Sequence, residues 1–201
     1  MNWSGEGYLA LSAVNVKDGF IDSSIDAHYG SKKLYDKWMK GNELHLGQVI
    51  FTTEAPMGNV AQVPDNEGYI LSQRVIAFSV IDKIITEDFL ATVLSSPTSF
   101  NRLSLLSSGG TAKGVSQKTL SMFTVTVPQR VEEQKKISKS IKTISKLITH
   151  HQRAHLTIYY KGVVKWLIKL EKPTYLLIII LNGLKFIKKA LLEKLRCQNI
   201  E

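Results

Sequence analysis

Cysteine is almost absent from this chain, which has a single one, Cys197, among 201 residues. One cysteine cannot form a disulfide framework within the chain and cannot by itself build a metal site. This scarcity favours a reducing compartment, so we expect a cytoplasmic protein. Residues 1–8 also lack a basic segment followed by an apolar stretch, and no secretory signal is therefore expected.

The motifs of common enzymes are missing as well. The sequence has no glycine-rich loop suited to S-adenosylmethionine after a first strand, no Asn-Pro-Pro-aromatic segment for adenine methylation, and no Gly-x-x-x-x-Gly-Lys-Ser/Thr segment for nucleotide phosphates. Its acidic residues are scattered without the spacing of a metal nuclease. We therefore predict a protein that is not an enzyme and that uses no cofactor or metal.

The sequence also has no apolar run long enough to span a membrane. Residues 175–181 form an apolar run of only seven residues, between Pro173 and Asn182. A transmembrane helix needs roughly twenty such residues. Charged residues, among them Lys169 and Lys185, interrupt any longer window, so no membrane span is expected.

Positive charge is abundant but unevenly distributed along the chain. The formal net charge is +9. Residues 1–129 hold 10 Lys/Arg and 12 Asp/Glu, a net charge of −2, whereas residues 130–201 hold 16 Lys/Arg and 5 Asp/Glu, a net charge of +11. The net charge therefore does not predict a basic patch on the first part of the chain.

The first part of the chain alternates strand and helix signals, which predicts an α/β or α+β globular domain over residues 1–128. Thr86 is a predicted helix N-cap, and Pro97 separates that helix from a second one. A turn-rich insert at 64–68 predicts a hairpin between two of the strands. The predicted strands are residues 8–16, a stretch from 20, 44–53, 59–63, 69–71, 74–80 and 124–127.

A long helix is predicted for residues 129–201, after Pro128, with an atypical tail. Its isoleucines are spaced four, three and four residues apart, which is the heptad spacing of a helix that packs on another helix. A helix packed on its own domain and an antiparallel or intermolecular coiled coil both explain this spacing. The predicted pairing positions are Ile137, Ile141, Ile144, Ile148, His151, His155 and Ile158. His151 and His155 also suit a metal, but without a third ligand nearby we predict a structural role.

Segments spread over residues 47–153 resemble, in order, parts of the specificity subunit of type I restriction–modification systems. Residues 47–58 are similar to its strand and turn G-x-[IL]-[IL]-F…P-x-G, and Ser72-Gln73-Arg74 stands at its glutamine-bearing strand start. Residues 109–120 resemble its G-T…[IL]-S…L segment. Pro128 followed by 133–137 resembles P-x-x-E-Q-x-x-I, the start of its long helix, and 150–153 resemble a later part of that helix. The resemblance covers roughly residues 8–160.

This resemblance implies a DNA-reading subunit without catalytic activity. Subunits of the family carry two α/β target recognition domains and two long helices that pack antiparallel as a spacer. Each domain reads one half of a split DNA sequence, and the subunit docks modification subunits, which methylate adenine, and restriction subunits. With one domain and one helix, this chain is expected to be a half-length form that pairs with a second half-subunit. The strand and loop that open the family's domains are expected to be missing before Tyr8.

Candidate DNA contacts come from three places in the sequence. Gly110, Thr111 and Lys113 offer backbone N–H groups, a hydroxyl and a cation to a phosphate, or else form a flexible loop. Gln73 and Arg74 are types that bond adenine or guanine bidentately, although Arg74 at the head of a strand also suits an ion-paired structural role. Lys32 and Lys33, set among aromatic residues, suit a DNA groove or the wet face of an amphipathic helix.

A second function remains open at this stage, that of a protein-assembly or membrane-surface module. It rests on the basic C-terminal part, on Trp166 and on the apolar run at 175–181, which suit an anionic lipid surface.

Overall fold

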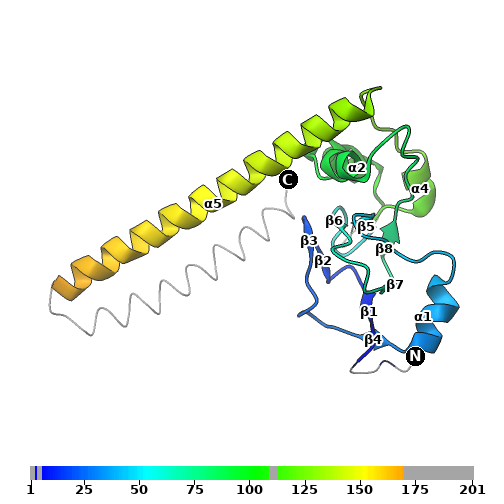
Figure 1. Ribbon diagram of the computed structural model, residues 1–201, viewed down its shortest axis with the longest axis horizontal. Coiled ribbons are helices and arrows are strands. Elements are labelled where there is room, and N and C mark those ends of the chain that lie inside the picture. The colour runs from blue at the N-terminus through cyan, green and yellow to red at the C-terminus, as the bar shows by residue number, and fades with distance from the viewer. Residues whose placement is uncertain (1–2, 4–5, 109–112, 170–201) are drawn as a thin grey trace. The chain divides into compact units, whose positions relative to one another are not determined.

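The computed structural model describes Trp3, residues 6–108 and residues 113–169, with side chains described as far as Gln152 (Figure 1). The chain divides into two units, Met1–Ile141 and Lys142–Glu201. The first unit mixes strands with helices, and the α+β class predicted for the globular part is confirmed.

The first sheet has the strand order β4-β1-β7 and is covered by α1. β1 (Tyr8–Leu11) pairs antiparallel with β4 (Tyr29–Gly30) and parallel with β7 (Tyr69–Leu71). α1 (Lys32–Met39) begins after Ser31, whose side chain caps the helix by accepting from the backbone N–H of Leu34. A separate hairpin joins β2 (Val16–Lys17) to β3 (Phe20–Ile21), so the single strand predicted for residues 8–16 is divided between two sheets.

The second sheet is antiparallel, with the order β6-β5-β8, and α2 packs on it (Figure 1). Its strands are β5 (Val49–Thr52), β6 (Val60–Gln62) and β8 (Val75–Ala77). β5 is buried throughout because it lies between two cores. Ile50 contributes to the first core, whereas Val49 and Phe51 contribute to the second. This alternation follows the two-residue period of a strand.

Three short helices complete the second core, and each begins after a hydroxyl side chain that caps it. α2 (Glu87–Leu94) is capped by Thr86, as predicted. α3 (Pro97–Leu106) is capped by Ser96 and has its proline in the first turn, where a missing N–H costs nothing. α4 (Gln117–Ser121) is capped by Ser116. Leu90, Leu103 and Leu120 bring these helices into the same core as Phe51.

Two other predicted elements are wrong. Residues 59–63 and 69–71 do not form a hairpin, because β6 pairs with β5 whereas β7 pairs with β1 in the other sheet. The turn-rich insert therefore links two sheets. Residues 124–127 form no strand. The chain there is an irregular connection from α4 to the long helix, with Phe123 packed on the second core.

The long helix, α5, runs Val131–Lys169 and begins on the globular unit. Gln134 in its first turns is fully buried. Its Oε1 accepts from the backbone N–H of Thr86 at 3.0 Å, and its Nε2 donates to the carbonyls of Ile84 and Pro128, both at 2.8 Å. The start of α5 is thus bonded to the start of α2. Within the described residues, no helix is long and apolar enough to cross a membrane.

Candidate nucleic-acid interface

Sequence positions far apart meet where β5 ends, at a site that we call the strand junction (Thr53, Glu54, Arg74 and Gly114). The backbone N–H of Thr53 donates to the carbonyl of Arg74 at 2.8 Å, and the carbonyl of Thr53 accepts from Val115 at 2.9 Å. Glu54 and Gly114 form an antiparallel bridge. Three chain segments therefore lie side by side, with the one that carries Glu54 in the middle.

Arg74 forms an ion pair with Glu54 at this junction. Its Nε lies 3.2 Å from Glu54 Oε2, and the two side chains are 52% and 39% exposed. Gln73 and Arg74 form the tight turn between β7 and β8, and both are exposed. The backbone φ of Arg74 is +66°, in the left-handed region that side chains rarely adopt. Arg74 is thus ion-paired, as one of the two sequence interpretations expects, but it reaches solvent.

Lys113 is exposed beside the junction, one residue before Gly114. Ser108 and Gly114 exchange two backbone hydrogen bonds, both of 3.0 Å, and these close the base of the loop between them. Gly110 and Thr111 lie outside the described residues. The segment that carries Gln73 and Arg74 therefore lies on one side of Glu54, and the segment that carries Lys113 lies on the other.

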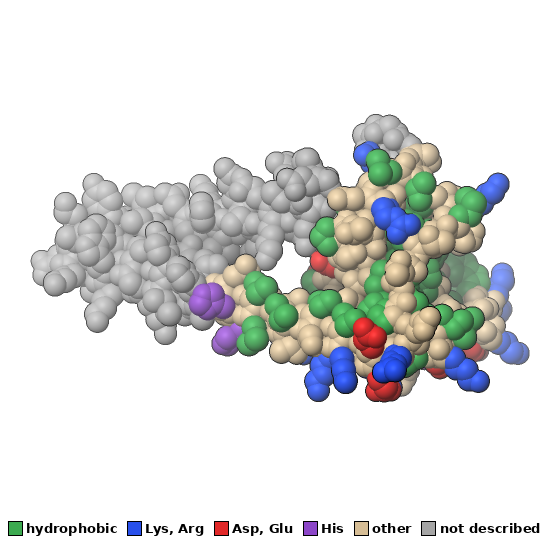
Figure 2. All heavy atoms as spheres, turned by 90° about the horizontal axis from the view of Figure 1, so that it is seen from above, with side chains coloured by type: hydrophobic (Ala, Val, Ile, Leu, Met, Phe, Trp, Pro, Cys, Tyr) green, Lys and Arg blue, Asp and Glu red, His purple; other side chains and the backbone are tan. Residues whose placement is uncertain are grey.

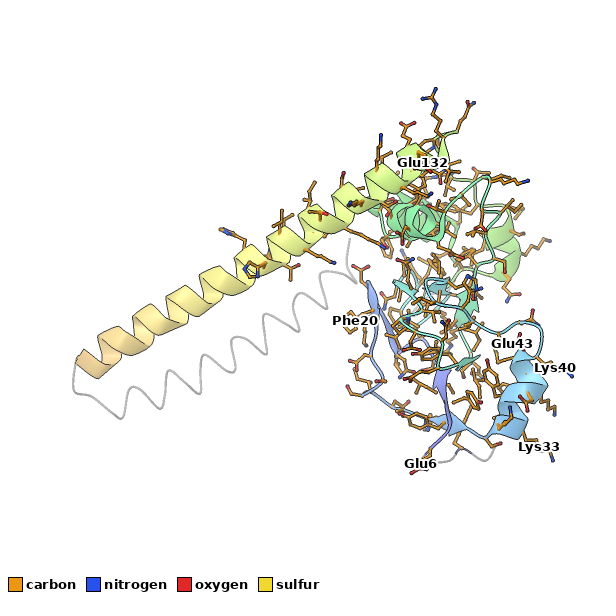
Figure 3. The ribbon with its side chains drawn as sticks, in the orientation of Figure 1. Glu6, Phe20, Lys33, Lys40, Glu43 and Glu132 are labelled. Atoms are coloured by element: carbon orange, nitrogen blue, oxygen red, sulfur yellow. The ribbon has the colours of Figure 1, made fainter. Side chains whose placement is uncertain are left out.

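Lys32 and Lys33 lie on α1, which packs against β7 and β4 of the first sheet. Lys32 is ion-paired with Asp36, at 3.3 Å. Lys33 is exposed and projects away from the domain, as does Lys40 (Figure 3). Tyr35 and Trp38 pack against the first core, and the Tyr35 ring stacks on Tyr8 with centroids 4.0 Å apart. α1 is thus amphipathic, and a DNA role for its lysines stays a prediction.

The C-terminal half of α1 borders a hollow that residues of β7 and β8 also line. This open hollow of about 640 Å³ is lined by residues of α1, Lys37 and Trp38, together with Leu71 and Ala77. Leu71 ends β7 and Ala77 ends β8, the strands on either side of the Gln73–Arg74 turn. Lys37 therefore lines the same hollow as a residue of each of these strands.

The isoleucine stripe of α5 (Ile137, Ile141, Ile144 and Ile148) is largely uncovered. Ile137 is half-buried, whereas Ile141, Ile144 and Ile148 are 44%, 55% and 53% exposed. Apolar side chains follow one another along this part of the helix in Figure 2. His151 is exposed as well. His155 and Ile158 lie outside the residues whose side chains the structure describes, and so does Trp166.

Glu54 and Arg102 are not among the candidate residues that the sequence predicts for this interface. Glu54 was absent from the candidates because its pairing with Arg74 spans twenty positions and two strands. Arg102 was also unconsidered, and its guanidinium lies 4.7 Å from the centroid of the Phe123 ring, a cation–π contact. Arg102 thus contributes to the packing of α3 against the segment that follows α4.

Comparison with known proteins identifies the family. Residues 17–158, more than half of the chain, match the sequence profile described as the type I restriction modification DNA specificity domain. The chain belongs to this family, as the resemblance in its motifs predicts. The match supports a specificity-subunit role in a restriction–modification system. No curated protein matches the chain.

Proposed function

We propose that this chain is the DNA-sequence-recognition subunit of a type I restriction–modification complex, without catalytic activity, and that it reads one half of a bipartite target. The family match over residues 17–158 carries this proposal. In it, residues 1–128 form the target recognition domain, and residues 129–201 serve as a spacer and pairing helix.

The strand junction is the part of the domain that we assign to double-stranded DNA. Gln73 and Arg74 have side chains that can bond base edges, and Lys113 supplies a cation for a phosphate beside them. Neighbouring strands lie about 5 Å apart, so the segments of Arg74 and Lys113, on either side of Glu54, are separated by about 10 Å. With that separation, Arg74 can lie in a DNA groove while Lys113 contacts a phosphate at the border of the groove. Gly110 and Thr111 extend the phosphate contact, and Lys32 and Lys33 form a second, more distant one.

The exposed stripe on α5 supports the pairing part of the proposal. Three isoleucines with heptad spacing, each about half exposed, leave apolar surface that a partner helix would cover. We assign this face to the helix of a second half-subunit, through Ile137, Ile141, Ile144, Ile148, His151, His155 and Ile158. The assembled pair docks the modification subunits, which in turn recruit the restriction subunits.

A selection experiment tests this function. The full chain is purified in complex with a modification subunit of a type I system, and the complex is used to capture duplexes from a pool with a randomised centre. We expect the captured duplexes to share one sequence made of two short blocks at a fixed spacing. Capture without any sequence preference would contradict the proposal. The modification subunit alone serves as the control and should select no sequence.

A further inference from the structure

We propose that Glu54 is a specificity-determining residue, and that Glu54 and Arg74 together read a guanine–cytosine base pair in the major groove. This inference rests on the proposed function and names the base pair that the strand junction recognises. It comes from the ion pair, whose two side chains are 52% and 39% exposed.

The ion pair fixes how Arg74 can approach a base. Nε of Arg74 lies 3.2 Å from Glu54 Oε2, so the negative charge of the carboxylate keeps the acceptor groups of a base away from that edge of the guanidinium. The two terminal amino groups of the guanidinium remain, and each carries N–H donors in one plane. Guanine presents two acceptors, O6 and N7, in the major groove, and an arginine held in this way meets both end-on.

The carboxylate of Glu54 then falls beside the partner base. In a guanine–cytosine pair, the amino group of cytosine lies next to guanine O6, and one of its hydrogens faces the major groove. A carboxylate accepts that hydrogen. An adenine–thymine pair keeps the N7 acceptor, but it puts the adenine amino group, a donor, in the place of O6 and thymine O4, an acceptor, before the carboxylate. The same two side chains therefore favour one pair and oppose the other.

The backbone around the pair is built to hold it still. Thr53 is bonded on both sides, to Arg74 and to Val115, directly before Glu54. A Cβ on Gly114 would lie 3.1 Å from Cγ and 3.3 Å from Cβ of Glu54, so the glycine leaves room for the stem of the glutamate. Such restraint preserves the side-chain geometry that base reading needs.

The unusual backbone of Arg74 also points to a use for its side chain. At φ +66° a glycine or asparagine would be the unstrained choice, yet the position holds an arginine that is half exposed. Strained positions of this kind concentrate at functional sites. Packing offers no competing reason, since the side chain is not buried.

Selection with variants of the full chain, in complex with the modification subunit and with the same random duplex pool, tests the pair. The wild type should select a half-site with an invariant guanine–cytosine pair. Arg74→Lys keeps the charge but loses the planar fork, so discrimination at that pair should fall about tenfold while other positions stay fixed. Glu54→Ala should weaken the selection of guanine–cytosine at the same position of the half-site. Glu67→Ala, at an exposed acid away from the junction, is the matched control and should change nothing.

The outcomes separate this inference from the function beneath it. If the wild type selects a sequence and neither Arg74→Lys nor Glu54→Ala alters it at any position, the inference is overturned and the proposed function stands. If the relaxed position is an adenine–thymine pair, the inference is also overturned. Absence of any selected sequence defeats both. Arg74→Asn guards against misfolding, because asparagine suits the backbone of this position, and its melting temperature should match or exceed that of the wild type.

Discussion

At the scale of single residues, Glu87 stands out in the structure. Its Oε1 is the one buried side-chain polar atom without a hydrogen-bond partner among the described residues. Its Oε2 accepts from the backbone N–H of Val49 at 3.0 Å, and His45 Nε2 lies 3.6 Å from Oε1. Burial raises the pKa of Glu87 above its ordinary value of 4.5, and the Val49 bond and His45 offset part of that rise.

Replacing Glu87 with glutamine should make the stability of the domain less dependent on pH. A carboxyl group whose pKa is raised on folding binds its proton more tightly in the native state, so the free energy of unfolding falls as pH rises from 4.5 through the folded pKa. Glutamine keeps an acceptor for Val49 and has no charge to bury. The stability of Glu87→Gln relative to the wild type should therefore increase as the pH is raised from below 4.5 to neutrality.

Urea unfolding of the two proteins at both ends of this pH range measures the difference. Glu133→Gln, at an exposed site, is the control and should follow the wild-type curve. A Glu87→Gln protein whose stability changes with pH as the wild type's does would show that burial of this carboxylate is not the cause.

At the scale of elements, the start of α5 depends on one buried side chain. Gln134 uses both ends of its amide to bond three backbone groups, at Ile84, Thr86 and Pro128. Ser138, one turn later and also buried, donates its hydroxyl to the carbonyl of Gln134 at 2.9 Å. These bonds explain in physical terms why a glutamine follows the acidic residues at the start of this helix.

Gln134→Glu should destabilise the globular unit strongly. The change keeps the shape, but it turns both amide donors into a carboxylate oxygen that faces two carbonyls, and a buried charge without a partner costs about 3–5 kcal/mol. Thermal unfolding of the full chain measures the loss. Glu133→Ala, at the exposed neighbour, should leave the melting temperature nearly unchanged. Equal melting temperatures for Gln134→Glu and the wild type would mean that the buried amide is not needed.

The isoleucine stripe gives a second prediction at this scale. Ile141→Asp with Ile144→Asp should abolish pairing of the chain, or its docking to the modification subunit, because charges replace an apolar seam. The globular unit should stay folded, since both isoleucines are about half exposed. Light scattering of the chain alone and with the modification subunit gives the mass of each assembly. Thr143→Asp with His150→Asp, off the stripe, is the matched control. Wild-type masses for the stripe variant would contradict the pairing.

Local signals predicted the elements better than their partners. The cap at Thr86, the proline of α3 and the heptad spacing of α5 depend on residues close together in the sequence, and each marked a real helix. The parallel pairing of β7 with β1 joins Leu9 to Tyr69, and nothing local encodes it. The expected hairpin failed for this reason. The same limit hid Glu54, because its partnership with Arg74 exists only once β5 and β8 are paired.

At the scale of the whole molecule, charge is separated along the chain. Residues 1–129 carry a net charge of −2, whereas residues 130–201 carry +11. A near-neutral domain attracts DNA weakly by net charge, so the proposed function depends on a few placed cations, for which we propose Arg74 and Lys113. In this proposal Arg74 contributes to sequence-dependent binding through a base edge, and Lys113 contributes to sequence-independent binding through a phosphate.

Salt dependence of DNA binding tests this division. For the complex on its selected duplex, affinity should fall steeply with salt, and Lys113→Ala should lower the slope of log affinity against log salt by about one, because one phosphate contact is lost. The loss in affinity should be equal for selected and unrelated duplexes. Lys40→Ala, which removes an equal charge at the exposed end of α1, should not change the slope. A larger loss on the selected duplex alone would assign Lys113 to base reading instead.

In the proposed function, this chain decides where a modification subunit acts. Sequencing of DNA after methylation by that subunit, with and without this chain, measures this most directly. With the chain present, methylated adenines should fall within one recurring bipartite sequence, and without it specific methylation should vanish. Methylation that is scattered, or that follows the same sequence in the absence of the chain, would contradict the account.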